Sequence, residues 1–357
     1  MLRLISVALI VATLCLASVA DDDLAALKQK AENGDAAAAM KLGEAYEFGY
    51  GVKADKFQAA DWYSRAAEAG NAEAQNVIGV KLRTGDGTRK DPSEAVNWFR
   101  KAAKQGNAGA MFNLGTMYYN GEGVLVSDQQ ALAWFIAAKE FGSKEAPEAV
   151  ERSLQDLNAG LQKAAISRAT EMLIQGTEVP AKPDAALPWL NRLVDAGDRT
   201  ATVRLGWLYL EGKGVPQDTK LALQTCKRGA DDNIPLAMVC LGYIYRKGIG
   251  TRMDSAEAAK WYEKASNCGH APSMIVLSEM YANGEGVKQD KLQQYALLTI
   301  AGKVLPEAGA ALDREREQMS PKQLKEADKR VTKILKNVDT RRCNREPSVV
   351  ARETESK

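Results

Sequence analysis

Apolar residues recur along most of this chain at the spacing of amphipathic helices, and the same stripe returns every 36 residues. Each stripe centres on a Leu-Gly or Ile-Gly pair, with one Leu-Ser pair in the same frame. Because apolar residues three and four positions apart share one face of a helix, each stripe predicts a helix with one buried face. The pairs are Leu42-Gly43, Ile78-Gly79, Leu114-Gly115, Leu205-Gly206, Leu241-Gly242 and Leu277-Ser278.

A glycine-rich turn and a second predicted helix follow each stripe. In the first copy the turn is Gly49-Tyr50-Gly51-Val52, and Asp55 follows it as a helix-capping residue. The aromatic pair Trp62-Tyr63 lies on the second helix, where it can pack back on the first. Glycine inside a helix costs about 1 kcal/mol relative to alanine, so its recurrence indicates a close approach of the neighbouring helix. The loop glycines are expected to supply positive φ.

The in-frame aspartates of the later copies extend this capping pattern. They are Asp91, Asp218, Asp254 and Asp290. One pair of helices cannot bury its apolar face alone, so neighbouring pairs must stack to form a core.

This pattern resembles the Sel1-like repeat family, a relative of the tetratricopeptide repeat. Residues Ala39 to Gly70 match almost the whole family pattern, Ala-x-x-x-Leu-Gly-x-x-Tyr-x-x-Gly-x-Gly-Val with a later Trp-Tyr and Ala-Gly. Six clear copies cover about 35–142 and 198–305. The resemblance implies an all-α fold, a right-handed α/α superhelix of stacked Sel1-like helix pairs.

The segment between the two arrays has two interpretations. In the first, residues 143–161 are an inserted helical segment, and 162–197 are a degenerate repeat with Thr170 in the glycine position. In the second, residues 143–176 cap a first module and 177–183 form a linker. The first is favoured because Gly176 precedes Trp189 by the same distance as Gly49 precedes Trp62.

Both ends of the chain depart from the repeat. Residues 1–20 combine a short basic start, an uncharged apolar run and small residues at Ser18 and Ala20, which predicts a signal peptide cleaved after Ala20. An uncleaved anchor is the alternative. Leu24 to Gly34 is in frame as a lone second helix and a plausible N-terminal cap. Ser320-Pro321-Lys322-Gln323 predicts the start of a C-terminal capping helix.

The predicted organisation is therefore one signal peptide, two arrays of repeats and three segments outside them. The segments are 1–20, the signal peptide; 21–142, a cap helix with three repeats; 143–161, the insertion; 162–305, one degenerate and three clear repeats; 306–337, capping helices; and 338–357, a flexible tail.

Composition narrows the class of partner. The chain has 357 residues, of which 45% are hydrophobic, so it can bury a core and is not a disordered chain. Its 48 basic and 46 acidic side chains nearly balance, and it lacks the strong basic field of a nucleic-acid-binding protein. No later segment is apolar enough for a membrane span. A periplasmic or secreted location is expected.

Export changes the interpretation of the cysteines. Loss of Cys15 with the signal peptide leaves an even number in an oxidising compartment, where disulfides form. Cys226 and Cys240 flank one turn and are predicted to pair, with two buried free thiols as the alternative. Cys268 and Cys343 could pair only if the tail folds back. No Cys-x-x-Cys motif is present, which argues against thioredoxin-type and zinc-knuckle sites.

Catalytic and ligand-binding motifs are sparse. His270 is the only histidine, and it falls in a turn where a solvent-facing role is more expected than metal ligation or base catalysis. The Gly-x-Gly turns lack a following Gly-Lys-Ser/Thr, so they are not predicted to bind phosphate. Ser-x-x-Lys and Lys-Thr-Gly motifs are absent from the sequence. We therefore expect no metal, no cofactor and no catalytic residue.

The resemblance implies a non-enzymatic scaffold that binds another protein or peptide in a concave groove lined by the first helices. By family analogy the role would be an adaptor in the bacterial envelope, in signalling, polysaccharide export, motility or host interaction. An envelope-directed hydrolase or penicillin-binding protein of the cysteine-rich Sel1-like type is one alternative, and a eukaryotic lumenal quality-control adaptor is another. The candidate groove residues, chosen from helical phase, are Glu44, Glu47, Asn76, Lys81, Asn113, Arg204, Trp207, Tyr243, Arg246 and Tyr281.

Overall fold

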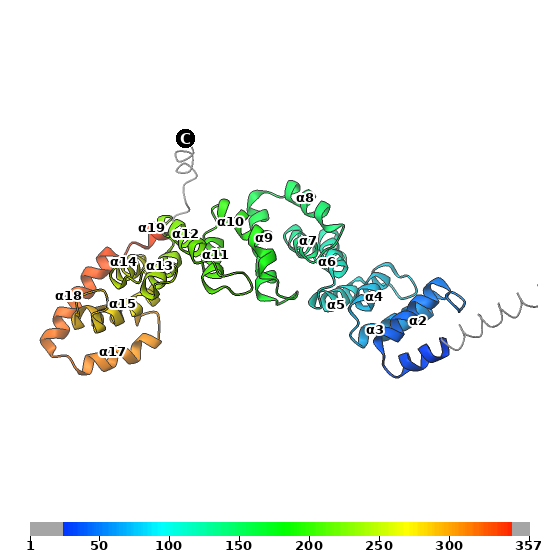
Figure 1. Cartoon of the computed structure of the whole chain (residues 1–357), viewed down its shortest axis with the longest axis horizontal. Coiled ribbons are helices and arrows are strands. Elements are labelled where there is room, and N and C mark those ends of the chain that lie inside the picture. Colours follow the sequence, from blue (N-terminus) through cyan, green and yellow to red (C-terminus); the bar gives the residue numbers. More distant parts are fainter. Residues whose placement is uncertain (1–23, 345–357) are drawn as a thin grey trace, which may run out of the picture. The chain divides into compact units, whose positions relative to one another are not determined.

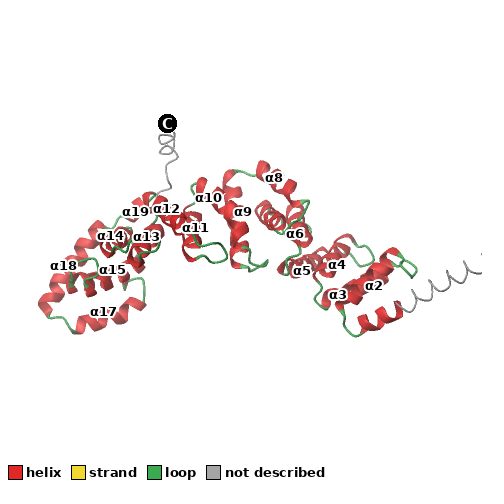
Figure 2. Ribbon diagram, in the orientation of Figure 1, coloured by secondary structure: helices red, strands yellow, loops and turns green. Residues whose placement is uncertain are grey.

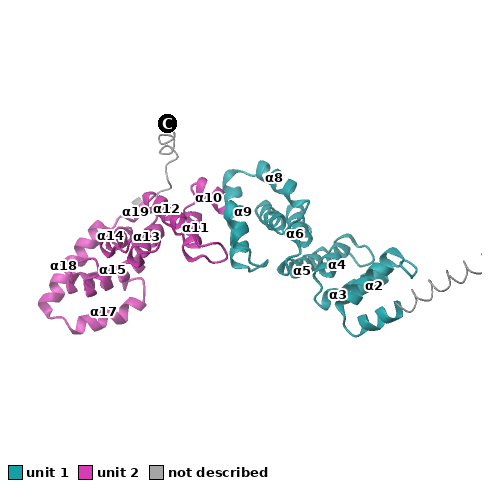
Figure 3. Cartoon of the chain, viewed as in Figure 1, with its two compact units in different colours: residues 1–189 teal, residues 190–357 magenta. Residues whose placement is uncertain are grey.

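The computed structural model describes residues 24–344, and these residues form helices joined by loops, with no strand among them (Figure 2). This confirms the predicted all-α fold of stacked helix pairs. The chain divides into two compact units, residues 1–189 and 190–357 (Figure 3), and each is described by itself. The predicted signal peptide and residues 345–357 of the predicted tail lie outside the described residues.

Unit 1 begins with a helix over residues 24–32, which precedes α2 (Figure 1). The helices that follow it are α2 (Ala36–Phe48), α3 (Lys56–Glu68), α4 (Ala72–Thr84), α5 (Pro92–Lys104), α6 (Ala108–Asn120), α7 (Asp128–Glu140), α8 (Ala146–Asp156) and α9 (Ala159–Gln175). The boundary between the units falls inside α10 (Pro183–Asp195).

Unit 2 continues the pairing of helices and ends with helices outside the repeats. Its helices are α11 (Arg199–Glu211), α12 (Thr219–Asp231), α13 (Pro235–Lys247), α14 (Ser255–Asn267), α15 (Ala271–Asn283), α16 (Lys291–Ala301), α17 (Glu307–Glu317), α18 (Pro321–Asn337) and α19 (Thr340–Asn344).

Aspartate side chains begin the second helix of most pairs, as predicted. In the first copy Asp55 accepts hydrogen bonds from the backbone N–H groups of Phe57 and Gln58. These bonds satisfy donors that the first turn of a helix leaves unpaired. The other aspartates predicted in register make equivalent caps: Asp91, Asp218, Asp254 and Asp290.

Where the first helix carries its glycine, that glycine lies directly against the second helix, which confirms the close approach expected from the sequence. A Cβ atom placed on Gly43 would lie 2.5 Å from the ring of Tyr63. In unit 2 the residue equivalent to Tyr63 is Cys226, which lies against Gly206. A Cβ atom placed on Gly206 would lie 2.7 Å from the Sγ of Cys226. The aromatic position is thus a cysteine in that one repeat, which places the thiol inside the helix pair.

The second glycine of the turn joins one repeat to the preceding one. A Cβ atom on Gly87 would lie 2.1 Å from the carbonyl oxygen of Lys56, at the start of α3. Gly286 approaches the carbonyl oxygen of Ser255 at the same 2.1 Å. Gly51, in the first repeat, has no atom within 4 Å at this position. The turn glycine therefore does more than adopt positive φ: it permits contact between repeats.

The insertion predicted over residues 143–161 contains the extra helix α8, and the following helix α9 is also longer, at 17 residues. Thr170 on α9 is completely buried, and its hydroxyl donates a hydrogen bond to the carbonyl oxygen of Ser167. Both α8 and α9 contact α7. The segment 143–161 therefore contains one added helix and the first residues of a lengthened one.

Two disulfides occur in unit 2. Cys226–Cys240 joins α12 to α13, as predicted, and Cys268–Cys343 joins the end of α14 to α19. The second bond differs from the expectation of a flexible tail over 338–357, because Cys343 is buried and the backbone N–H of Asp339 donates to the carbonyl oxygen of Asn267. Residues 338–344 are therefore held against the end of α14.

Non-repeat helices cover the outermost pair in each unit. Ala31 of the leading helix is buried in one cluster with Ala38 and Leu42 of α2. At the other end Ser320 and Gln323 form a reciprocal capping box that begins α18, as the sequence predicted, and α18 contacts α16. These helices keep the apolar faces of the outer pairs from water.

We predict that Gly87→Ala destabilises the protein more than Gly51→Ala does. Both glycines have φ near +70°, at 71° and 72°, so both substitutions incur about 1–3 kcal/mol of left-handed strain. Only the Gly87 variant also forces a methyl group into the Lys56 carbonyl, which should add about 1–3 kcal/mol. Urea-induced unfolding followed by circular dichroism measures both losses, and equal losses would contradict the proposed repeat–repeat contact.

Candidate partner-binding surface

The first helices of neighbouring repeats bring several of the predicted groove residues together. In unit 1 the side-chain amide of Asn113 donates to that of Asn76 at 3.0 Å, which links α6 to α4. In unit 2 the ring centroids of Trp207 and Tyr243 lie 5.8 Å apart, which links α11 to α13. Residues one repeat apart in the sequence therefore become direct neighbours on one surface.

The surface of unit 2 around Trp207 combines aromatic, apolar and cationic groups. Tyr243 is 37% exposed and Trp207 is half-buried, so part of each ring is available to a partner. Arg204 lies half-buried on the same helix, and it lines a cavity of about 340 Å³ with Val203 and Leu236. We call Arg204, Trp207, Tyr243 and this cavity the aromatic surface of unit 2.

Arg246 is engaged within the protein. Its Nε and Nη2 atoms donate to the two carboxylate oxygens of Glu285 at 2.8 and 2.7 Å. This bidentate pair raises the pKa of Arg246 and lowers the pKa of Glu285. Because Glu285 belongs to the loop of the next repeat, the pair ties one repeat to the next. Tyr281 is half-buried, and burial raises its pKa.

Lys81 is a correction to the sequence-based set, because its side chain is buried rather than directed into a groove. The residue is 5% exposed, and its Nζ lies 2.5 Å from Glu47 and 3.2 Å from Asp86. Lys56 approaches Asp86 from the other side at 2.6 Å. Lys81 therefore belongs to an internal ion-pair cluster. Glu44, one turn before Glu47, is exposed.

Comparison of equivalent positions in the repeats indicates that Lys81 occupies a core position. Lys81 lies two residues after Gly79, and the residues at that offset in the other clear repeats are all buried and apolar. They are Ala45, Met117, Leu208, Ile244 and Met280. The position of Lys81 around its own helix does not show that the site is buried. Alignment of the repeats does show it, because the equivalent residues are all apolar.

Charge explains why a lysine is tolerated there. Elsewhere a cation four residues after the helical glycine meets an acid in the next loop, as in Arg83–Glu122 at 3.8 Å and Arg246–Glu285. At the first junction both equivalent positions are acidic, Glu47 and Asp86. Lys81 supplies the missing cation from the core side, since two partly buried carboxylates would otherwise repel each other.

His270 serves the backbone. Its Nδ1 accepts a hydrogen bond from the backbone N–H of Ser273 at 3.2 Å and so caps α15. The hydroxyl of Ser273 lies 2.7 Å from the same nitrogen, but Ser273 is 1% exposed, so this histidine–serine contact cannot reach a substrate. Burial lowers the pKa of His270, which favours the neutral ring that can accept these bonds.

Among residues 24–344, no three or more histidine, cysteine, aspartate or glutamate side chains are grouped so that they could hold a metal ion. Within the same residues, none of the helices has the length and apolar character needed to cross a membrane.

The repeats are similar to a known family. A family model described as the Sel1 repeat matches six segments, which together cover more than half of the chain. The matched segments are 36–71, 72–107, 108–140, 200–231, 235–270 and 271–297. The unmatched residues 141–199 contain α8 and the predicted degenerate repeat. No curated protein matches the chain in sequence.

Two solved structures of repeat proteins are also similar to this chain. A protective antigen of uropathogenic Escherichia coli with an SLR fold is 22% identical, with 94% of this chain and 97% of the antigen covered, at a TM-score of 0.34. A Sel1 repeat protein from Oxalobacter formigenes is 27% identical, with 84% and 82% covered, at a TM-score of 0.39. Because both TM-scores are below 0.5, no residue correspondence is taken from either structure.

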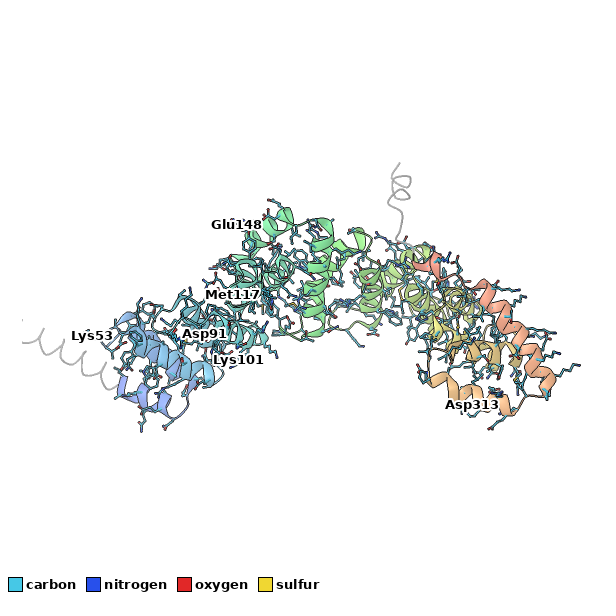
Figure 4. All side chains as sticks on the ribbon, turned by 180° about the vertical axis from the view of Figure 1, so that it is seen from behind. Lys53, Asp91, Lys101, Met117, Glu148 and Asp313 are labelled. Carbon is cyan, nitrogen blue, oxygen red and sulfur yellow. A yellow bond between two sulfur atoms is a disulfide. The ribbon has the colours of Figure 1, made fainter. Side chains whose placement is uncertain are left out.

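We predict that Lys81→Met lowers the free energy of unfolding of the protein by about 1–3 kcal/mol. The expected loss is below that of a fully buried pair because Glu47 and Asp86 are 20% and 35% exposed. Chemical denaturation measures it, with Lys53→Met as the control, since Lys53 is an exposed lysine (Figure 4).

The double variant Glu47→Arg with Lys81→Met should recover most of that stability. It places an arginine opposite Asp86, as Arg83 lies opposite Glu122, and a methionine at the position of Met117. A double variant as unstable as Lys81→Met would show that charge balance at this junction does not explain the lysine.

We predict that His270→Asn weakens the loss of stability at acidic pH. Burial lowers the pKa of His270 in the folded state, whereas an unfolded histidine titrates near 6.5. The unfolded chain therefore takes up this proton first, and the contribution of His270 to stability falls as pH drops below about 6.5. Asparagine keeps the cap, as Asn71 and Asn107 show. Urea midpoints at neutral and mildly acidic pH measure the difference, and an unchanged acid sensitivity would refute it.

Proposed function

Because the chain belongs to the Sel1 repeat family, whose repeats mediate protein interactions, we propose that it is an exported scaffold that binds a protein or peptide partner. The observation that carries this proposal is the aromatic surface of unit 2. There Trp207 and Tyr243 from adjacent repeats make a partly exposed aromatic pair. Tryptophan, tyrosine and arginine supply most of the binding energy in protein interfaces.

The aromatic surface also has the right physical make-up for a peptide. Rigid rings offer a large contact area at a low entropic cost, and Arg204 can bond to an acidic group at the rim. The neighbouring cavity, with Leu236 48% exposed at its edge, would accept one apolar side chain of the partner. The predicted groove residues Glu47, Lys81 and Arg246 act in ion pairs between repeats, so their contribution to binding would be indirect.

Two disulfides support export. Disulfides persist in oxidising compartments such as the periplasm, the extracellular space and the lumen of the endoplasmic reticulum. Cys226–Cys240 and Cys268–Cys343 both lie in unit 2, and the signal peptide proposed over residues 1–20 accounts for how the chain reaches such a compartment. We place the protein in the bacterial envelope, as an adaptor in signalling, polysaccharide export, motility or host interaction, with a eukaryotic lumenal adaptor as the alternative.

A non-enzymatic role is part of the same proposal. The histidine is committed to a helix cap, and the serine beside it is buried. A hydrolase or penicillin-binding protein would instead need a nucleophile and a base that face one cavity. Saturable hydrolysis of a β-lactam or of peptidoglycan by the purified protein would overturn this part of the proposal.

We predict that Trp207→Ala and Tyr243→Ala each reduce recovery of the partner in a pull-down by about tenfold or more. The loss follows because an aromatic anchor at an interface contributes about 2 kcal/mol or more. Phe57→Ala is the matched control, since Phe57 is an exposed aromatic residue on the second helix α3. Partner recovery that is unchanged in both variants, or reduced equally in the control, would contradict the assignment of the aromatic surface.

A further inference from the structure

Unit 1 holds a cavity that the aromatic surface does not include. It measures about 270 Å³ and is bounded by side chains of α5, α6, α7 and α9 and of the loop after α9. Its wall includes Arg100, Lys104, Tyr118, Trp134, Arg168 and Glu178. These residues come from two clear repeats and from the segment that follows the inserted helix α8. We call this cavity the unit 1 pocket.

The wall of the unit 1 pocket carries more positive than negative charge. Arg168 is neutralised, because its Nη2 donates to both carboxylate oxygens of Glu178 at 2.8 and 3.0 Å. Arg100 and Lys104 have no acidic partner within residues 24–344, and both are exposed. Two cations on one wall therefore remain available to an anion that enters the pocket.

Hydrogen-bond donors are also left over in this pocket. Trp134 is 2% exposed, and within the described residues its Nε1–H has no hydrogen-bond acceptor, nor has the buried Nε–H of Arg168. The hydroxyl of Tyr118 accepts a bond from Arg100 at 2.9 Å, which leaves its own proton free to donate. Arg100, Lys104 and the Tyr118 hydroxyl therefore favour a ligand that supplies acceptors and negative charge.

The surroundings of Trp134 set it apart from its repeat equivalents. Trp62 and Trp261 occupy the same position and also have unpaired Nε1 atoms, but each carries a cation from its own helix over the ring. Those cations are Arg65 at 4.6 Å and Lys264 at 3.7 Å from the ring centroids. At Trp134 the corresponding residue is Ala137, so the cations near this indole come from the pocket wall.

We propose that the unit 1 pocket binds a carboxylate group of the partner polypeptide, from an acidic side chain or from its C-terminus. The identity of the ligand as a polypeptide rests on the proposed scaffold function. A carboxylate has two coplanar oxygens that can accept from Arg100 or Lys104 and from the Tyr118 hydroxyl together.

The test uses the full mature chain and small probes, so it does not need the natural partner. The probes are the N-acetylated peptide Gly-Gly-Ala with a free C-terminal carboxylate, the same peptide as a C-terminal amide, N-acetyl-Gly-Glu-Gly amide, and inorganic phosphate. The readout is the indole ¹H–¹⁵N resonance of Trp134, assigned with Trp134→Phe. At least one carboxylate peptide should shift this resonance saturably, and the peptide without a carboxylate should not. Comparison of the shifts caused by the two acidic peptides shows whether the pocket prefers a C-terminal carboxylate or a glutamate side chain.

Substitutions on α5 test whether the shift of the Trp134 resonance reports binding in the unit 1 pocket. Arg100→Gln and Lys104→Gln should each weaken binding of the carboxylate peptide about tenfold, the effect of one charge-assisted hydrogen bond. Lys101→Gln is the matched control on α5 (Figure 4), because Lys101 stacks on Trp98 at 3.7 Å and does not line the pocket. Its affinity should be unchanged.

Three results would overturn the proposal: no shift with either carboxylate peptide, a shift with inorganic phosphate alone, or equal losses in Lys101→Gln. None of the probes depends on Trp207 or Tyr243, so failure here leaves the pull-down test of the scaffold function intact. Conversely, a failed pull-down with a positive titration would retain the pocket and reject only the aromatic surface.

Discussion

The architecture depends on one close contact, in which the backbone of a turn lies on the first residues of the preceding repeat's second helix. At Gly87 and Gly286 the space for a side chain is already occupied by a backbone carbonyl oxygen. A carbonyl at the start of a helix cannot move without loss of the first helical turn. Neither backbone segment can therefore shift to make room for a side chain at the glycine position. At these junctions the helix pair is held to the preceding one through this point, while the helical glycines hold the two helices of a pair together.

Charges are arranged around this constraint. Once the turn is pressed against the previous repeat, its acidic residue lies beside the end of the previous first helix, where Arg83 and Arg246 supply cations. The first junction has acids on both sides, and a lysine replaces a core residue to balance them. The Nζ of Lys81 also lies 5.7 Å from the ring centroid of Tyr63, within the range of a cation–π contact.

The sequence carried most of the fold because the repeat presents the same local chemistry many times. The 36-residue frame located the helix pairs, the aspartate caps and the helical glycines, and the local sequence at Ser320 located the capping box. The positions on a single helix did not distinguish Lys81 from residues that face solvent. Such positions give the direction of a side chain around its own helix but not the residues of neighbouring helices that it contacts. Residues 338–344 were also missed, since their packing depends on a long-range bond from Cys343 to Cys268, 75 residues away in sequence.

The same reasoning separates residues that build the scaffold from residues that remain for a partner. A regular array uses its polar groups at each junction, so a regular junction has little left to offer a ligand. Unit 1 departs from regularity after α7, where α8 intervenes and α9 is lengthened, and this is where cations and the side chain of Trp134 line one cavity. Unit 2 departs from it at α12, where Cys226 replaces the usual aromatic ring and the neighbouring first helices present Trp207 and Tyr243. The groups that can distinguish one partner from another therefore lie beside the irregular parts of the array, on repeats that are themselves well matched.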